Sequence, residues 1–166
     1  GWPWFALRYF NACGATATRG ERHEPETHLI PCILRAATGE QPHVDVLGDD
    51  YPTPDGTCVR DFIHVEDLAD AHILTLGADP AASGPYNAAT GRGYSVREVI
   101  EAARRVTGRP IAMRVAPRRP GDPPELVADP AKLQRTFGWR ARHDLEAVLR
   151  SAWEFQLRQT GALTAG

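Results

Sequence analysis

Ionisable side chains cluster in residues 58–72, where an apolar run gives way to a helical pattern. Arg60, Asp61 and His64 lie in this stretch, and His72 falls on the apolar stripe of the helix that follows. Asp61 and His64 are an acid–base pair by type, but their spacing at a strand end does not make them face each other, and no nucleophile is nearby. Structural roles are favoured for both over catalysis, and His72 is expected to be a hydrogen-bonded core residue.

Arg60 and Arg119 are stronger candidates for contact with a ligand. Each follows apolar or proline-rich chain, where a solvated charge is not expected. The planar guanidinium group matches phosphate oxygens, and a charge-assisted hydrogen bond contributes on the order of 1.5–3 kcal/mol. Two such arginines would anchor a diphosphate, whereas surface or salt-bridge roles are the alternative. The spacing of the two arginines alone does not decide between diphosphate binding and a surface or salt-bridge role.

The histidines and cysteines do not have the spacing of a metal site. His23 and His28 lie in a loop without suitably placed partners, and Cys13, Cys32 and Cys58 are far apart with no CxxC pair. A closed ligand set is the usual requirement for structural zinc, so no metal is expected. The cysteines also argue against a disulfide framework and fit a reducing cytoplasm.

The bulk composition is that of an ordinary globular domain. The chain has 166 residues, 42% hydrophobic and 24% charged, with a net charge of −2. This charge implies no general attraction to nucleic acid or membranes, and no apolar run reaches the roughly 18 residues that a membrane span needs. One α/β domain is the expected class.

The periodicity and turn residues predict strands interleaved with helices. Apolar positions 65, 68, 69, 73 and 76 are expected to face the core from a helix over 65–76. Ser95 and Glu98 have capping-box spacing for a further helix. The other expected elements are strands 4–10, 44–47, 86–89 and 111–115, loops 12–27, 48–57 and 117–125, a helix over 29–38 closed by Gly39, a helix begun by Asp129–Pro130 and ended by Gly138, and a last helix capped by Asp144.

Several stretches occur together in the order of a known family. LRYFNACGA, GERHEPETHLIP, GDDYPTPDGTCVRDFIHVEDLADAH, YNAATGRGYSVREVIE and APRRPGD resemble the C-terminal half of UDP-glucose 4-epimerase, over about residues 5–158. The resemblance implies the C-terminal part of an extended Rossmann-type short-chain dehydrogenase/reductase fold. Residues 1–166 would then be the substrate-binding portion, with a few strands of the parallel sheet and without the N-terminal NAD-binding region.

The resemblance also implies contacts with the substrate. Tyr9, Phe10 and Asn11 correspond to strand-end residues between nicotinamide and the UDP-sugar, so Tyr9 and Phe10 are expected to touch NAD as well. His28 and Leu29 correspond to contacts of the diphosphate. Many family members have asparagine where His28 stands, so a changed hydrogen bond is expected there.

A short strand provides the implied contact with the uracil. Asp45, Val46 and Leu47 correspond to the strand along the uracil, with leucine where the family often has phenylalanine. Uracil stacking is therefore expected to be weaker.

The remaining implied contacts concern the diphosphate, the ribose and the sugar. Arg60 and Arg119 correspond to the diphosphate arginines, and Asp122 to a ribose contact. Phe62 stands where tyrosine is common, so a hydroxyl is missing beside Arg60. Leu126 is near the position that limits room for a 2-acetamido group, and its intermediate size leaves N-acetylated sugars open.

The residues that perform the family's chemistry are missing from this sequence. The family epimerises UDP-glucose and UDP-galactose through a 4-keto intermediate, with a YxxxK tyrosine as base and NAD on a glycine-rich turn. None of the four tyrosines is followed by lysine four residues later, and no such glycine pattern occurs. We therefore expect a truncated half that is inactive alone, has no catalytic residue of its own, and exposes an unpaired apolar strand edge over 4–10. Family homodimers pair through the other half, which makes dimerisation doubtful here.

Three functions remain open at this point. The chain is the UDP-sugar-binding half of an epimerase, a UDP-sugar-binding module without catalysis, or half of a related nucleotide-sugar dehydratase or decarboxylase. The YPTPDGT stretch weighs against the third.

Overall fold

The first strand region is divided between two neighbours. In the computed structural model, which describes residues 2–161, β1 (Phe5–Tyr9) pairs in parallel with β5 (Gly84–Ala88). The chain bends at Phe10, and β2 (Asn11–Cys13) then pairs in parallel with another strand. The prediction of one strand over 4–10 was therefore too simple, and the predicted loop over 12–27 begins too early.

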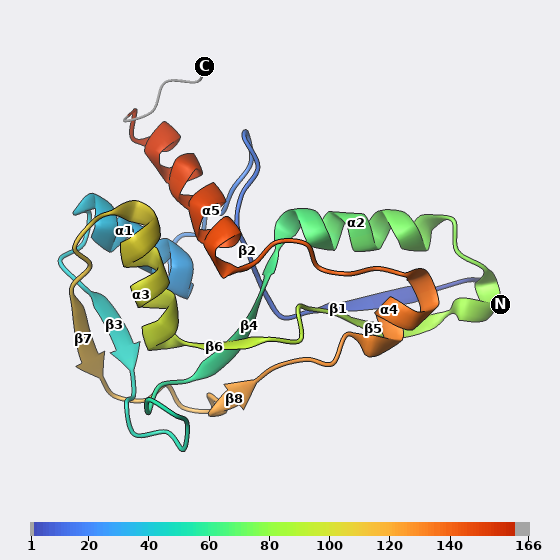
Figure 1. Cartoon of the computed structure of the whole chain (residues 1–166), viewed down its shortest axis with the longest axis horizontal. Helices are drawn as coiled ribbons and strands as arrows, with labels where there is room; N and C mark the ends of the chain where they lie inside the picture. Colours follow the sequence, from blue (N-terminus) through green and yellow to red (C-terminus); the bar gives the residue numbers. More distant parts are fainter. Residues whose placement is uncertain (1, 162–166) are drawn as a thin grey trace.

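The partner of β2 is β4 (Val59–His64), which is the central strand of the fold. Its first half pairs antiparallel with β6 (Gly93–Ser95) and parallel with β8 (Glu125–Leu126). In Figure 1, β4 runs through the middle of the molecule. A separate parallel pair, β3 (Val44–Leu47) and β7 (Met113–Ala116), lies at one end.

Several helices begin or end at the capping residues that the sequence indicates, although α4 begins at Ala131, one residue later than expected. Ser95 and Glu98 form a reciprocal capping box, and Asp144 accepts from Ala147 N at 2.8 Å. Gly39 and Gly138 end their helices in the left-handed conformation. The helices are α1 (Leu29–Thr38), α2 (Val65–Leu76), α3 (Val96–Thr107), α4 (Ala131–Phe137), α5 (Leu145–Gln159) and a 3-10 turn, η1 (Pro80–Ala82).

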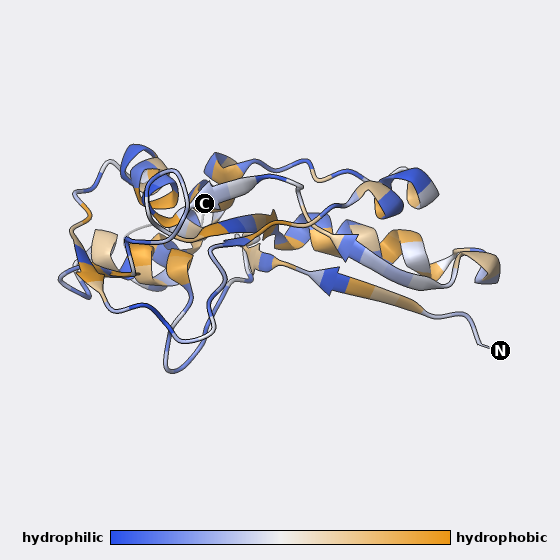
Figure 2. Ribbon diagram, turned by 90° about the horizontal axis from the view of Figure 1, so that it is seen from below, coloured by the Kyte–Doolittle hydropathy of each residue, from blue (hydrophilic) through white to orange (hydrophobic). Residues whose placement is uncertain are grey.

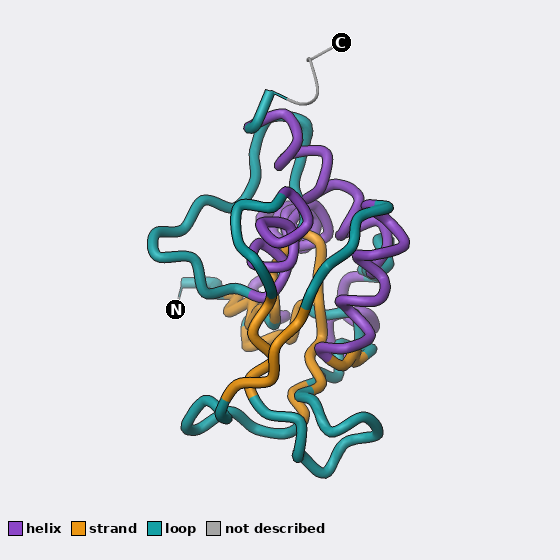
Figure 3. Tube along the Cα trace, turned by 90° about the vertical axis from the view of Figure 1, so that its left-hand side faces the viewer, coloured by secondary structure: helices purple, strands orange, loops and turns teal. Residues whose placement is uncertain are grey.

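Two apolar clusters hold the elongated molecule together. The larger one joins α1, α3 and α5 to β3 and β4, with Ile33, Ile100 and Leu149 fully buried. The smaller one joins α2, α4 and β5 around Leu133 and Trp139. Seen along the long axis, the helices gather above and to one side of the strands (Figure 3). None of the described helices is long and apolar enough to cross a membrane.

The apolar stripe predicted for α2 is only half buried. Leu68 lies in the core, but Ala69, Ile73 and Leu76 are exposed, the last at 86%. The face that turns inward carries Asp67 and Thr75 instead. Helical periodicity identifies a helix, but which face is covered depends on neighbours elsewhere in the chain, and that part of the prediction was wrong.

Candidate functional site

A large pocket lies between the ends of β2 and β4, the start of α1, β3 and the C-terminal half of α5. Its volume is about 1230 Å³. Segments that are far apart in the sequence therefore meet on one surface. Most of the residues singled out from the resemblance line it, namely Phe10, Asn11, His28, Leu29, Asp45, Leu47, Arg60, Arg119 and Asp122.

Three of the residues singled out do not line this pocket. The side chain of Val46 is buried in the larger apolar cluster. Leu126 is 45% exposed on β8, and Tyr9 is 49% exposed at the end of β1. The Tyr9 hydroxyl lies 2.7 Å from Nε2 of His72. Nδ1 of His72 donates to the carbonyl of Leu68 at 2.8 Å, so Nε2 is left to accept from the Tyr9 hydroxyl.

His72 is hydrogen-bonded as the sequence suggested, but it is not a core residue. Its ring packs edge-on against Tyr9 with the centroids 5.6 Å apart, and the residue is exposed on α2. The pair therefore joins the end of β1 to the outer face of α2.

Arg60 is held on β4 at the pocket wall. Its side chain is 13% exposed, and Nη1 donates to the carbonyl of Val59 at 2.8 Å. Nη2 lies 3.6 Å from Oδ1 of Asp122. Part of the guanidinium group is thus bonded to the protein, and a half-buried arginine with one carboxylate neighbour among the described residues is a strong partner for an anion.

Arg119 reaches the same pocket from the loop after β7. Within residues 2–161, its side chain has neither an ion pair nor a hydrogen bond to another side chain. Burial raises the pKa of the nearby Cys32 thiol, and Glu26 adds to this shift. The positive charge of Arg119 partly opposes it. Arg119 therefore places an uncompensated positive charge at the pocket.

The start of α1 adds further donors for an anion. Leu29 is the first residue of α1, and its backbone N–H and that of Ile30 have no partner within the helix. Pro31 has no N–H, and the N–H of Cys32 donates to the carbonyl of His28 at 3.1 Å. His28, just before it, contributes no side-chain cap. A helix N-terminus favours negative charge. Arginine side chains and helix N–H groups thus approach one cavity.

His28 is fixed by a buried carboxylate. Its Nδ1 lies 2.9 Å from Oε1 of Glu26, whose side chain is 3% exposed. The same oxygen accepts from the backbone N–H groups of Thr27 at 2.8 Å and His28 at 2.7 Å. Glu26 therefore organises the loop before α1. It also holds the imidazole of His28 in a defined position, at the site where many family members have asparagine.

Asp61 has a structural role. Its carboxylate accepts from Thr90 N at 3.0 Å, from Thr90 Oγ1 at 2.6 Å and from Gly91 N at 2.9 Å, and the residue is fully buried. These bonds fix the turn between β5 and β6. Asp61 and His64 point to different partners, which agrees with the structural interpretation of both.

His64 closes a buried network around α2 and α5. Its Nδ1 accepts from the backbone N–H of Glu66 at 3.1 Å, which places the ring proton on Nε2, 2.9 Å from Ser151 Oγ. Ser151 also accepts from Ala15 N at 3.1 Å. Burial, the largest cause, and the neighbouring His143 lower the pKa of His64, so the ring stays neutral.

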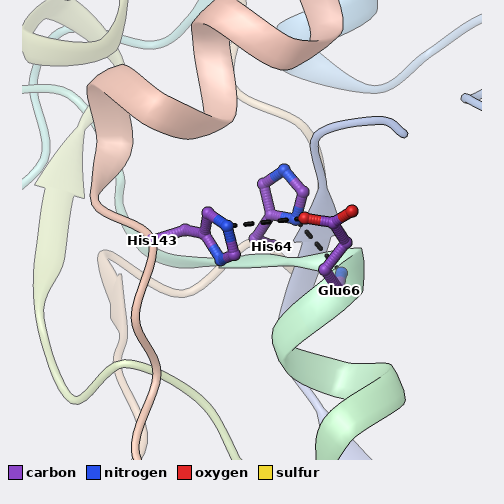
Figure 4. Close-up of side chains that lie close together, drawn as sticks. All are labelled: His64, Glu66 and His143. Atoms are coloured by element: carbon purple, nitrogen blue, oxygen red, sulfur yellow. Dashed lines mark hydrogen bonds and ion pairs between the residues drawn. The ribbon is translucent and has the colours of Figure 1, made fainter. Parts of the chain in front are cut away.

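His64, Glu66 and His143 lie close together, as Figure 4 shows. The two rings are stacked, with centroids 4.1 Å apart and an interplanar angle of 23°. Metal ions bind imidazole nitrogens in the ring plane, and two stacked rings do not direct their lone pairs at one point. Nδ1 of His64 is moreover occupied by a backbone donor. The cluster is therefore a packing and hydrogen-bonding node rather than a metal site.

The structure adds a second wall to the pocket that the sequence did not indicate. The loop from Gly14 to Arg22 lines the cavity together with Phe155 and Gln156 of α5. A Cβ on Gly20 would lie 2.4 Å from the Phe155 ring, so the loop packs directly on α5. The glycine was visible in the sequence, but its partner is more than a hundred residues away along the chain and no local pattern links them.

Comparison with known proteins shows the family to which the chain belongs. A sequence profile of the family described as GDP-mannose 4,6 dehydratase matches residues 1–152. The UDP-glucose 4-epimerase of Corynebacterium glutamicum is 49% identical over 152 residues, which cover 90% of this chain and 46% of that protein. That of Streptomyces lividans is 50% identical, again over 90% of this chain and 46% of the relative.

Solved structures show the same similarity. The UDP-glucose 4-epimerase of Stenotrophomonas maltophila, solved with NAD and a formylated UDP-arabinopyranose, superposes with a TM-score of 0.91 at 43% identity, over 96% of this chain and 49% of that one. The enzyme of Bifidobacterium longum, solved with NAD+ and UDP, gives 0.88 at 38% identity, over 98% and 50%. The chain therefore belongs to the family of extended short-chain dehydrogenases/reductases that the profile represents, and it spans about half the length of its UDP-glucose 4-epimerase relatives.

Proposed function

We propose that the chain is the UDP-sugar-binding half of a UDP-glucose 4-epimerase, the enzyme that interconverts UDP-glucose and UDP-galactose with NAD. The observation that carries the proposal is the approach of Arg60, Arg119 and the start of α1 to one pocket. Arginine side chains and helix N-termini are the groups that proteins use to bind phosphate. Asn11 and Asp122 line the same cavity, where they offer polar groups to the sugar and the ribose.

The edge of β3 supports a place for the base. Asp45 and Leu47 line the pocket, and β3 pairs only with β7 among the described strands. Its second edge therefore leaves backbone N–H and C=O groups available to a uracil. The Asp45 carboxylate is engaged by Nε and Nη2 of Arg114 at 2.9 and 3.1 Å, so the backbone rather than this side chain is expected to pair with the base.

The residues of this chain do not by themselves fit NAD. A dinucleotide needs open glycines at a strand-to-helix turn. Here a Cβ on Gly93 would meet Val59 at 2.5 Å and Val127 at 2.7 Å, and one on Gly91 would meet Pro130 at 3.2 Å. Protein side chains already fill the space that these glycines leave. NAD would therefore be held mainly by a separate half, and no hydride-transfer step is assigned to this chain.

Exposed apolar surface supports the need for such a half. β1 pairs with β5 on one side only among the described strands, and Figure 2 shows apolar residues along it at the outer edge of the molecule. Ile73 and Leu76 of α2 are exposed at 65% and 86%. An open strand edge beside an apolar helix face is the expected attachment surface for further strands and helices.

Titration of UDP by calorimetry tests the binding proposal. Arg60→Ala is expected to weaken UDP binding at least tenfold, since a charge-assisted hydrogen bond contributes about 1.5–3 kcal/mol. Arg105→Ala is a matched control, because Arg105 is 63% exposed and pairs with Glu146 on the surface. Equal UDP affinity of the Arg60→Ala and Arg105→Ala chains would contradict the assignment.

A UDP-sugar-binding module without catalysis is the second candidate. It is favoured by the glycine packing, which leaves this chain no dinucleotide cradle of its own. An assay with UDP-galactose and NAD separates the two when the chain is mixed with the NAD-binding half of a relative. Restored epimerisation supports the epimerase half, whereas UDP binding without turnover in the mixture supports the module.

A further inference from the structure

Arg118 is turned away from the pocket and held by the turn that precedes β4. Its Nε lies 2.6 Å from Oδ1 of Asp50, and its Nη2 donates to the carbonyl of Asp50 at 2.5 Å. The guanidinium carbon lies 4.1 Å from the centroid of the Tyr51 ring. One side chain thus makes two hydrogen bonds and a cation–π contact with two consecutive residues.

The turn that receives Arg118 is closely packed and internally hydrogen-bonded. Gly56 has φ +80°, and a Cβ there would lie 2.0 Å from the carbonyl oxygen of Asp49. Thr53 Oγ1 donates to the carbonyl of Thr57 at 2.7 Å. Tyr51 is 5% exposed, so the ring on which Arg118 rests is fixed in the protein.

Gly48 makes room for the contact. A Cβ on Gly48 would lie 2.6 Å from Cγ of Arg118 and 2.7 Å from Cε2 of Tyr51. The backbone at this position has φ +92°, which glycine adopts without strain. The stem of Arg118 and the Tyr51 ring therefore both rest against the turn backbone, and this packing requires the glycine.

Arg118 immediately precedes Arg119, and the chain between β7 and the turn at 120–121 is not helical. The two consecutive side chains have different surroundings, because Arg118 contacts Asp50 and Tyr51 whereas Arg119 lines the cavity. With Arg118 fixed on the turn, Arg119 is directed toward the cavity that it lines. The backbone N–H of Asp122 donates to the carbonyl of Arg119 at 3.3 Å, which closes this loop on its other side.

We infer that Arg118, held by Asp50 and Tyr51, is a positioning residue that directs Arg119 at the diphosphate of the ligand. The inference rests on the proposed function and deepens it. It also gives the GDDYPTPDGT stretch a specific role, because the turn holds the arginine loop in place. The turn acts from outside the pocket, since neither Asp50 nor Tyr51 lines the cavity.

Asp50→Asn separates positioning from plain electrostatics. Asp50 is 72% exposed and lies outside the pocket lining. Removal of its negative charge leaves the surroundings of the pocket more positive, so electrostatics alone predicts unchanged or tighter UDP binding. Positioning predicts the opposite, because the charge-assisted bond to Arg118 is lost and Arg119 is no longer directed. We expect UDP to bind roughly three- to tenfold more weakly, which corresponds to the partial loss of one charged hydrogen bond.

Calorimetry with UDP and with uridine completes the test. Uridine has no diphosphate, so Asp50→Asn is expected to leave its affinity unchanged within about twofold. Asp70→Asn is the matched control, because Asp70 of α2 pairs with Arg142 and neither residue lines the pocket. Its UDP affinity is expected to equal that of the unaltered chain.

The outcomes test the positioning role of Arg118 separately from the proposed binding of UDP. If the unaltered chain binds UDP and Asp50→Asn binds it equally well or more tightly, the positioning role is wrong while the proposed binding stands. A parallel loss of UDP and uridine affinity would also overturn it, since that indicates general damage. No binding of UDP by the unaltered chain would overturn the proposed function itself.

Discussion

Replacement of Asp61 by alanine is expected to destabilise the fold strongly. The carboxylate is fully buried and accepts from two backbone N–H groups, those of Thr90 and Gly91, and from the Thr90 hydroxyl. Each buried donor left without a partner costs about 1–3 kcal/mol. Two fully buried backbone donors would give about 2–6 kcal/mol. Thr90 is half-buried and Gly91 is exposed, so water can reach these donors and lower the cost, and we expect about 3–4 kcal/mol.

Urea denaturation of the chain measures this change in the free energy of unfolding. Asp61→Asn is expected to cost less, about 1–3 kcal/mol, because the amide keeps one acceptor but presents an N–H to a donor. Asp79→Ala is the control, since Asp79 caps the exposed turn η1 with a single bond to Ala81 N at 2.8 Å. Its expected cost is about 0.5–2 kcal/mol. An Asp61→Ala cost no larger than that of Asp79→Ala would refute the structural role assigned to Asp61.

Three further predictions concern stability. Gly14→Ala is expected to destabilise more than Gly39→Ala by about 1–3 kcal/mol in urea melts, because both glycines have φ near +80° but only a Cβ on Gly14 would meet His64, at 2.5 Å. Equal costs would contradict this packing. Burial lowers the pKa of His64, so below about pH 6.5 the unfolded chain binds a proton that the folded ring does not. Lowering the pH below about 6.5 should therefore decrease the free energy of unfolding by up to about 1.4 kcal/mol per pH unit. His64→Gln should give a shallower slope between pH 7 and 5, and an unchanged slope would count against a neutral buried ring. Leu149→Ala, in the core, is expected to cost about 2–5 kcal/mol by the same urea measurement, and a cost under about 1 kcal/mol would show that the core is not packed around it.

The helix boundaries could be predicted because their signals are local. Gly39 and Gly108 end helices in the left-handed conformation, Asp144 caps α5, and Ser95 with Glu98 forms the capping box. Each of these devices acts within a few residues of chain. The strand that sequence periodicity placed at 111–115 is shifted to Met113–Ala116. Strand ends depend on a partner strand that a local pattern does not contain.

The elements that were missed are short or are set by distant contacts. β8 has two residues and exists only through pairing with Val59 and Arg60 of β4. The exposed stripe of α2 was predicted to be buried, because periodicity marks apolar residues without identifying what covers them. Asp129 accepts from Ala131 N at 2.8 Å, but α4 begins one residue later than expected, at Ala131.

For the candidate site too, some residues could be predicted from the sequence and the contacts that hold them could not. The residue types and the family resemblance singled out Arg60 and Arg119, and the fold brings both to one pocket. The support of Arg119 could not be foreseen, because the turn that holds its neighbour is about 70 residues away in the sequence. The partners of Asp61 at residues 90–91 were equally invisible. The type of a functional side chain can be recognised in a sequence, whereas the contacts that position that side chain depend on long-range packing.

A crystal structure of the chain with UDP is the most direct test of the central claim. We expect the diphosphate between Arg60 and Arg119 at the start of α1, with the uracil along the open edge of β3. UDP bound elsewhere on the chain, or a diphosphate that contacts neither arginine, would contradict it.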